Sequence, residues 1–194
     1  MSQNYLYHCI QPDNEPSSGT FSEFSMADFT LTFPQRKLVT GSIRISANVA
    51  LVGGVANNDA AISNVFIDPK VGAHALFDQF STTLDRVGQI ENILEYNKYA
   101  KAVSQATSSH TDFMKGSKVC AVGGDGTISF RKSGAVRMNL RVARALQIMY
   151  GASVAAAGTT GQSISITNLR LHFASVADDG VDMPLTLSNT ISVK

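Results

Sequence analysis

The strongest candidate for chemistry in the sequence is the segment AVGGDGT at residues 121–127. Gly123, Gly124 and Gly126 would let the backbone approach a phosphate group closely, and Asp125 is suited to a metal ion or a nucleotide. The same residues also suit a tight β-hairpin, because glycine adopts positive φ angles without steric cost. The residues that follow favour one of these two interpretations.

This GGDGT segment resembles the phosphate-binding turn of NAD kinases and diacylglycerol kinases, which implies a nucleotide-dependent kinase as one function. Such an enzyme places a helix after the turn, inside a doubly wound α/β domain. Here TISF at 127–130 and AVRMNLRV at 135–142 follow, and both have the alternation typical of strands. We therefore expect a hairpin at 123–127. We predict that the protein is not an enzyme and has no catalytic residue and no cofactor.

Histidine and cysteine residues give no indication of a metal site. They show no short ligand spacing such as HxH or HxxxH and stand at His8, His74, His110, His172, Cys9 and Cys120. Two cysteines so far apart also make no disulfide framework, so we expect a reducing compartment. We predict no metal ion.

Charged residues are few and balanced. Sixteen basic and fifteen acidic residues give a net charge of +1, and the charged fraction is 16%, below the usual quarter or so. No large electric field attracts the chain to nucleic acid or to an anionic membrane. Low charge suits a surface that neighbouring molecules cover. The sequence shows neither a signal-peptide pattern nor an apolar run of about 20 residues, so we expect a soluble protein made inside the cell.

Four arginines fall on the polar side of predicted strands: Arg44, Arg137, Arg141 and Arg170. They would suit a surface that faces nucleic acid or a neighbouring subunit, because guanidinium pairs well with phosphate and carboxylate. The alternative is a solvated sheet face with scattered ion pairs. The near-zero net charge favours the alternative.

Alternating apolar and polar residues predict strands along most of the chain. The strand-like segments are 29–33, 42–51, parts of 64–84, 119–122, 127–130, 135–142 and 163–176. In the last of them the apolar residues change parity between Ile166 and Leu169. This change predicts a β-bulge at Thr167–Asn168, because one extra residue returns the apolar side to the core.

Helical spacing occurs in one long segment. Ile90, Ile93, Leu94, Ala100 and Val103 recur at helical intervals and predict a helix near 89–106. The segment 143–151 is expected to form a short helical turn.

These elements predict an all-β fold, a sandwich of about eight antiparallel strands with one inserted helix. Pattern alone does not separate a barrel, an immunoglobulin-like sandwich and a jelly roll. The inward parity of the strands predicts one core containing Ile43, Ile45, Val49, Leu51, Val136, Met138, Leu140, Leu169, Leu171 and Phe173.

The order of several sequence blocks is similar to a known viral family. FTLTFPQRKLVTGSIRISANVAL, IDPKVGAHALFDQFSTTL and GQIENILEYNKYAKAV come first, and ISFRKSGAVRMNLRVARALQIMYGA and ITNLRLHFASV follow. Together they resemble the first jelly roll of double-jelly-roll major capsid proteins of polinton-like and adintovirus-like double-stranded DNA viruses, over roughly residues 24–178. The resemblance implies a jelly-roll β-sandwich, a pseudo-hexameric homotrimer and a place in the icosahedral shell of a virion.

The resemblance also implies a division of the chain. We expect a flexible N-terminal arm at 1–21, the jelly-roll domain at 22–178 and a C-terminal extension at 179–194 that leads towards a second jelly roll. We expect the 194 residues to form one jelly roll, whereas proteins of that family carry two. The chain is therefore expected to be a first half, or a single jelly roll that pairs with copies of itself or with a sister chain.

The expected function is self-assembly, with the chain itself and other capsid proteins as partners. No small-molecule substrate and no membrane span are expected, and the net charge gives no indication of genome contact. The expected subunit contacts are Tyr5 and Tyr7 in the arm, Tyr96 and Tyr99 on the helix, and Leu185, Leu187 and Ile191 near the C-terminus. A lectin-like β-sandwich binding module, which would stay monomeric and bind glycans, is a further alternative.

Overall fold

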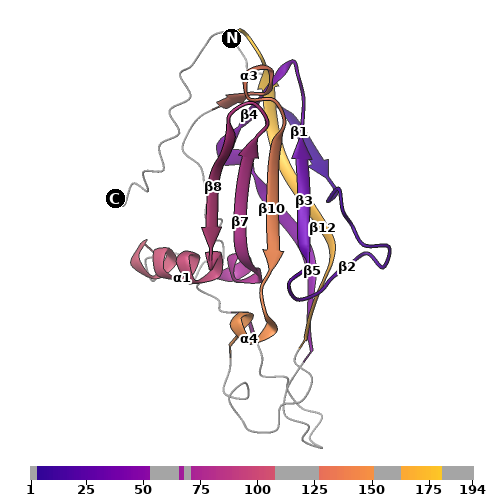
Figure 1. Cartoon of the computed structure of the whole chain (residues 1–194), viewed down its shortest axis with the longest axis vertical. Coiled ribbons are helices and arrows are strands. Elements are labelled where there is room, and N and C mark those ends of the chain that lie inside the picture. Colours follow the sequence, from indigo (N-terminus) through magenta and orange to yellow (C-terminus); the bar gives the residue numbers. More distant parts are fainter. Residues whose placement is uncertain (1–3, 53–65, 68–70, 108–126, 151–162, 181–194) are drawn as a thin grey trace, which may run out of the picture.

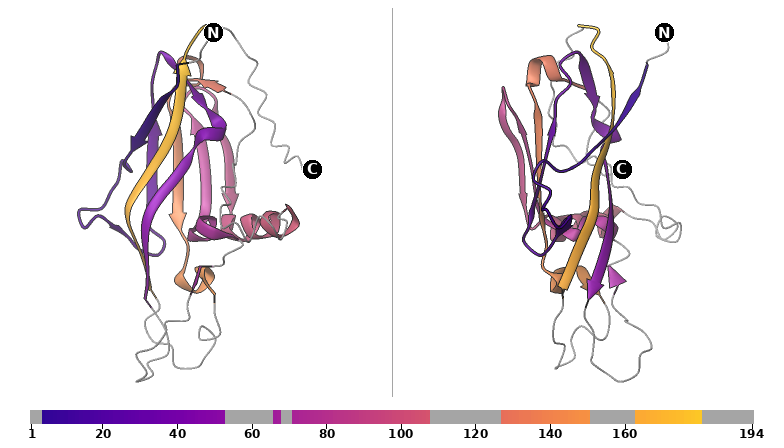
Figure 2. Two further views of the ribbon diagram at one scale, coloured as in Figure 1. Left: turned by 180° about the vertical axis from the view of Figure 1, so that it is seen from behind. Right: turned by 90° about the vertical axis from the view of Figure 1, so that its right-hand side faces the viewer.

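The chain folds as an antiparallel β-sandwich. The computed structural model describes residues 4–52, 66–67, 71–107, 127–150 and 163–180. Their strands form two large sheets and one small pair, and the two large sheets lie face to face (Figures 1 and 2). The predicted all-β class is thus confirmed.

The larger sheet has six strands arranged around one long central strand, β12 (Ser163–Ala177). The strands β1 and β2 pair with one side of β12, while β4 and β5 pair with the other side, and β9 adds to β4. The bounds are β1 Leu6–Ile10, β2 Thr20–Phe21, β4 Arg36–Val39, β5 Arg44–Val52 and β9 Thr127–Ser129.

The smaller sheet has the order β3-β10-β7-β8, with β3 and β8 at its edges. Its strands are β3 Met26–Leu31, β10 Val136–Val142, β7 Phe77–Leu84 and β8 Gly88–Leu94, and a separate pair joins β6 Phe66–Ile67 to β11 Met149–Tyr150. The helical elements are η1 Thr40–Ser42, η2 Gly72–Leu76, α1 Tyr96–Thr107, α3 Phe130–Ser133 and α4 Ala145–Ile148.

Strand pairing follows a nested order along the chain. The strand β1 pairs with β12, β3 with β10, β4 with β9, and β7 with β8. Among these eight strands, each strand of the first half therefore pairs with the strand at the mirrored position of the second half, while β2, β5 and β6 lie outside this order. The chain behaves like one long antiparallel hairpin that is folded over to make two sheets.

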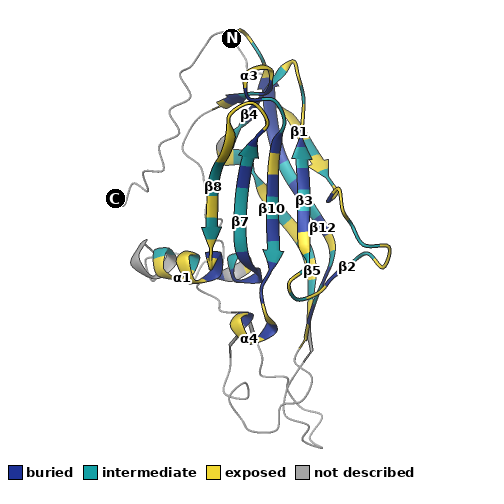
Figure 3. Ribbon diagram, in the orientation of Figure 1, coloured by how far each residue is buried: buried dark blue, intermediate teal, exposed yellow. Residues whose placement is uncertain are grey.

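The core lies between the two sheets and contains the residues that strand parity predicts. Every second residue of β10 is buried, which is visible as alternating colour in Figure 3. The same holds in β12 on either side of Thr167–Asn168 up to Phe173, after which residues 174–176 are all buried. Of the predicted core residues, Leu51 has a side chain outside the described part. The others are buried or pack against the core cluster: Ile43, Ile45, Val49, Val136, Met138, Leu140, Leu169, Leu171 and Phe173.

The predicted β-bulge in β12 is confirmed. Its register against β5 shifts between Thr167 and Arg170, and Asn168 has a φ of 52°, in the left-handed region. Asparagine tolerates that region better than most residues. The extra residue keeps Ile166 and Leu169 on the buried side of the sheet although their separation is odd.

The prediction of a helix near 89–106 is wrong in its first part. Residues Gly88–Leu94 form strand β8, and the helix α1 begins at Tyr96. Between them Glu95 has a φ of 55° and turns the chain. Figures 1 and 2 show α1 projecting sideways from the sandwich at the end of β8.

A second β-bulge explains the misleading helical spacing of Ile90 and Ile93. Thr82 of β7 pairs with Glu91, whereas Thr83 pairs with Gln89, so Ile90 is an extra residue on β8. Both isoleucines therefore pack against the core. A bulged strand and a helix can both place residues three apart on one face.

The stretch 1–21, expected to be a flexible arm, contributes two strands to the larger sheet. Strand β1 pairs with β12 over five residues, and β2 pairs with it over two. Ile10 packs against the core while Tyr7, on the other side of β1, is exposed. The prolines and polar residues around β1 hide its short alternation in the sequence. The helical turn expected within 143–151 is present as α4.

Candidate assembly site

The residues expected to contact other subunits lie in different environments. Tyr5, Tyr7 and Tyr99 are exposed, and Tyr7 is the most open with 84% of its surface accessible. Leu185, Leu187 and Ile191 lie outside the described residues, as do Asp125 and the three glycines of the GGDGT segment.

Tyr96 is not available to another subunit, which corrects the expectation for that residue. It is only 6% exposed, its hydroxyl lies 2.7 Å from Nδ1 of His74, and its ring lies 5.6 Å from that of Phe80. As the first residue of α1, Tyr96 anchors the helix to the sandwich. Burial at this contact lowers the pKa of His74.

The arginines on the strand faces are mostly paired with carboxylates. The pairs are Arg137–Asp85 at 2.8 Å, Arg141–Asp78 at 2.7 Å and Arg170–Glu15 at 3.6 Å. These contacts match the interpretation of a sheet face with scattered ion pairs. Within each of these three pairs the opposite charges neutralise each other locally.

One edge of the smaller sheet is covered by side-chain contacts. Asn14 Nδ2 donates to the carbonyl of Met26 at 3.0 Å, and the backbone N–H of Asp28 donates to Asn14 Oδ1 at 2.9 Å. The backbone N–H of Asp13 also donates to the carbonyl of Asp28, at 2.7 Å. The loop after β1 thus takes the place of a neighbouring strand beside Met26–Asp28, the first half of β3, and blocks pairing with another chain there.

The opposite edge of the smaller sheet is formed by β8. Within the described ranges no strand pairs with its outer side. Val87, directly before β8, and Leu94, its last residue, are exposed. An uncovered edge with apolar residues nearby is a site where another chain can add.

The end of the larger sheet holds a polar network that fixes β1. Arg36 Nε donates to Ser175 Oγ at 2.6 Å, and Ser175 Oγ lies 2.7 Å from His8 Nε2. Arg36 also donates through Nη2 to the carbonyls of Ser175 and Asn4, at 2.8 and 3.2 Å. We call Arg36, Ser175 and His8 the N-terminal clasp, because they join β1, β4 and β12.

Aromatic rings enclose the histidine of the clasp. The His8 ring lies 4.2 Å from the ring of Phe33 and 4.7 Å from that of Phe173, against which it stacks. Burial lowers the pKa of His8, and the positive charge of Arg36 lowers it further. The imidazole is therefore held in its neutral form at neutral pH.

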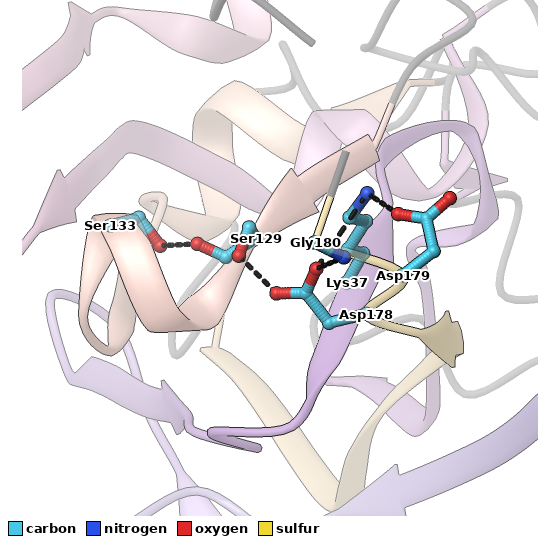
Figure 4. A network of polar contacts seen from close by, with 6 residues as sticks. All are labelled: Lys37, Ser129, Ser133, Asp178, Asp179 and Gly180. Atoms are coloured by element: carbon cyan, nitrogen blue, oxygen red, sulfur yellow. Dashed lines mark hydrogen bonds and ion pairs between the residues drawn. The ribbon is translucent and has the colours of Figure 1, made fainter. Parts of the chain in front are cut away.

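A second network fixes residues 178–180, directly after the end of β12 (Figure 4). Lys37 makes ion pairs with Asp178, at 3.7 Å, and with Asp179. Asp178 also accepts hydrogen bonds from the Ser129 hydroxyl at 2.5 Å and from the N–H of Gly180 at 3.0 Å. We call this network the C-terminal clamp.

The central charges of the C-terminal clamp are largely buried. The side chains of Lys37 and Asp178 are 9% and 7% exposed. The hydrogen bond to Asp179 is the main cause of the raised pKa of Lys37. The hydrogen bond from Ser129 is the main cause of the lowered pKa of Asp178. Both groups are thus kept charged, and the clamp holds the first residues after β12.

Two adjacent residues of β4 hold both networks. Successive side chains of a strand point to opposite faces, so Arg36 reaches the N-terminal strand while Lys37 reaches the chain after β12. Neither residue was identified from the sequence. The sequence does contain a signal for this pairing. The basic residues Arg36 and Lys37 begin β4, which is otherwise apolar, and the acidic residues Asp178 and Asp179 directly follow β12, the last strand.

The arrangement can fix β1 and the first residues after β12, but it is poorly built for covalent chemistry. A serine hydroxyl beside an imidazole is the geometry of a nucleophile with its base. Ser175, however, is 0% exposed, so a substrate cannot reach it. Its third partner is a cation, which opposes the imidazolium that such catalysis forms.

Two broader features concern the described part of the chain. It contains no cluster of three or more potential metal ligands, and none of the described helices has the length and hydropathy to cross a membrane.

Comparison with protein-family models and with curated proteins finds no match for this chain.

Proposed function

We propose that the chain is a jelly-roll capsid subunit, a structural protein of a double-stranded DNA virus that assembles with copies of itself. The observation that carries this proposal is the nested order of strand pairing. The proposed assembly unit is a homotrimer, which is part of an icosahedral shell in the virion. No residue is proposed to perform catalysis.

A jelly roll is a double sheet of eight strands that contains two Greek keys. Four nested pairs, β1–β12, β3–β10, β4–β9 and β7–β8, are what a folded antiparallel hairpin of eight strands produces. The chain also alternates between the sheets, since β1 and β4 lie in one and β3 and β7 in the other. This order supports a jelly roll over an immunoglobulin-like sandwich.

Fold alone does not determine function, so the surface must support assembly as well. The chain covers the β3 edge with Asp13 and Asn14 and leaves the β8 edge open within the described ranges. Tyr5, Leu6 and Tyr7, three successive apolar residues at the start of β1, are exposed. Many weak contacts of this kind, repeated by symmetry, are sufficient to close a shell.

The kinase alternative receives no support from the strands around the GGDGT segment. Residues 127–129 form β9, the four-residue helix α3 follows, and β10 pairs antiparallel with both neighbours. The helices that a doubly wound sheet needs on both of its faces do not occur in the described ranges. No specific observation favours a lectin-like module.

The proposal is tested by light scattering and negative-stain electron microscopy of the purified chain at micromolar concentration. We expect trimers or larger particles whose interfaces each bury more than about 1,000 Å². Tyr7→Ser should reduce assembly, whereas Lys98→Ser, at an exposed position of α1, serves as the matched control. A chain that stays monomeric up to the highest soluble concentration would overturn the proposal.

A further inference from the structure

Strand β1 is an edge strand of the larger sheet. It pairs with one strand only among those described, β12, through the register Leu6–Ser175 to Ile10–Leu171. Its other edge faces away from the sheet, and Tyr7 is largely exposed. The side chains that hold it are Ile10, which packs against the core, and His8 of the N-terminal clasp.

The clasp requires a neutral histidine. Arg36 Nε–H already donates to Ser175 Oγ, so the serine can direct its single proton to His8 Nε2. A second proton on the imidazole would turn Nε2 into a donor, and Ser175 Oγ could accept from it only if the hydroxyl proton turned away from His8. Ser175 is fully buried, and its hydroxyl proton would then lose its acceptor, which is costly away from water.

The surroundings of His8 supply no anion to stabilise the imidazolium among the described residues that face it. From β12 the ring faces Ser175 and Phe173, and from the segment after β3 it faces Phe33. The charged residue that faces the ring is Arg36 of β4, whose positive charge opposes protonation of the His8 imidazole. Contact with two aromatic faces favours a cation to some extent, but burial and the guanidinium oppose it.

The loop after β1 supplies a fixed pivot. Asp13 and Asn14 are tied to Asp28, so a detached β1 would swing about Gln11. The residue before a proline prefers an extended conformation, and Pro12 follows directly. Movement of β1 would therefore leave the cover of the β3 edge in place.

We propose that β1 is an exchangeable strand, which docks in the same register on β12 of a second copy of this chain and which is released when His8 takes up a proton. The occupant of the vacated β12 edge is another copy's β1, because residues 171–175 already fit that sequence in every copy. Exchange would also carry the exposed Tyr5 and Tyr7 into the contact between copies. The inference rests on the proposed function and deepens it by assigning one subunit contact and its regulation.

The test uses the natural cysteine of β1, since Cys9 and His172 are direct partners in the register. Two variants of the whole chain are made, both with Cys120→Ser. The first keeps Cys9, and the second carries Cys9→Ser and His172→Cys with ¹⁵N labelling. Only exchange of β1 brings Cys9 of one chain beside position 172 of the other. Mass spectrometry of the oxidised mixture identifies the disulfide between Cys9 of the unlabelled chain and position 172 of the labelled chain.

Copies mixed at pH 5 and returned to pH 7.5 before oxidation should form the mixed disulfide. Copies kept at pH 7.5 should form several-fold less. His8→Gln in both chains, which cannot take up the proton, should remove this dependence on pH. A control chain carrying Cys9 and His172→Cys together establishes that the intrachain bond can form. If it does not form, Tyr7→Cys with Ala174→Cys provides the neighbouring pair.

An absent mixed disulfide at both pH values, in a chain whose intrachain bond forms, would overturn strand exchange. An equal yield at both pH values would overturn the role of His8. The mixed disulfide reports strand docking and not particle formation. Shells without exchange would therefore refute this inference alone, and exchange without larger assemblies would refute the proposed function alone.

Discussion

Truncation of Phe173 tests both the core and its link to β1. The ring is 1% exposed and lies 4.7 Å from the His8 ring and 5.7 Å from the Phe33 ring. Phe→Ala in a well-packed core costs about 3–5 kcal/mol, and aromatic pairs add about 0.5–1.5 kcal/mol. We expect Phe173→Ala to lower the free energy of unfolding by roughly 4 kcal/mol. For a chain of this length the melting temperature should fall by roughly 8–16 °C.

The measurement is urea unfolding followed by circular dichroism. Leu94→Ala is the matched control, because Leu94 is 63% exposed and its loss should cost less than about 0.5 kcal/mol. A double-mutant cycle of Phe173→Ala with His8→Ala should give a coupling energy of about 0.5–1.5 kcal/mol. A loss below about 1 kcal/mol for Phe173→Ala would refute tight packing of this ring, and zero coupling would refute the contact with β1.

Three further predictions concern charge and the glycine-rich segment. Lys37→Met should lower the free energy of unfolding by roughly 3 kcal/mol, because it leaves a buried aspartate without its cation. Lys98→Met, in an exposed pair, should cost less than about 1 kcal/mol in the same urea titration. Stability should fall as the pH drops below about 6.5, because the pKa values of His8 and His74 are lowered in the folded state and the unfolded chain binds those protons first. Urea midpoints from pH 7 to 5 measure this, and His74→Phe should flatten the curve. Asp125→Ala should leave particle size in light scattering unchanged, and saturable ATP binding lost in that variant would contradict the hairpin interpretation.

Strand parity was sufficient to predict the class of fold and most of the core. In β10 and β12 one face is buried and the other is polar, so the period of two is directly visible in the sequence. The bulge at Asn168 was predictable for the same reason, because the change in parity is meaningful only if both halves bury one face.

Two local features could not be predicted from spacing. Ile90 and Ile93 are consistent with a helix or with a bulged strand, and the pairing of β8 with β7 decides between them. Strand β1 is only five residues long and includes a histidine on its inward side. Its pairing depends on β12, near the other end of the chain, to which local sequence gives no pointer.

The candidate site was predicted only in part. Exposed Tyr5 and Tyr7 are plausible contacts from composition alone, whereas Tyr96 is the same residue type and is buried. The clasp and the clamp depend on distant residues that meet at the end of β12, such as His8 with Ser175 and Lys37 with Asp178. These contacts between distant residues depend on the topology of the strands, and the pattern of apolar and polar residues did not determine that topology.

The position of β12 in the chain determines when the sandwich can close. The smaller sheet is complete once β10 ends at Val142, but β12 ends at Ala177, 35 residues later. At about 5–20 residues per second, a ribosome needs roughly 2–7 s for that stretch. During this interval the nascent chain presents the apolar inner face of a finished sheet, which is a natural substrate for chaperones. Strand β1 also has no partner within its own chain until β12 has been synthesised, because it pairs with residues 171–175.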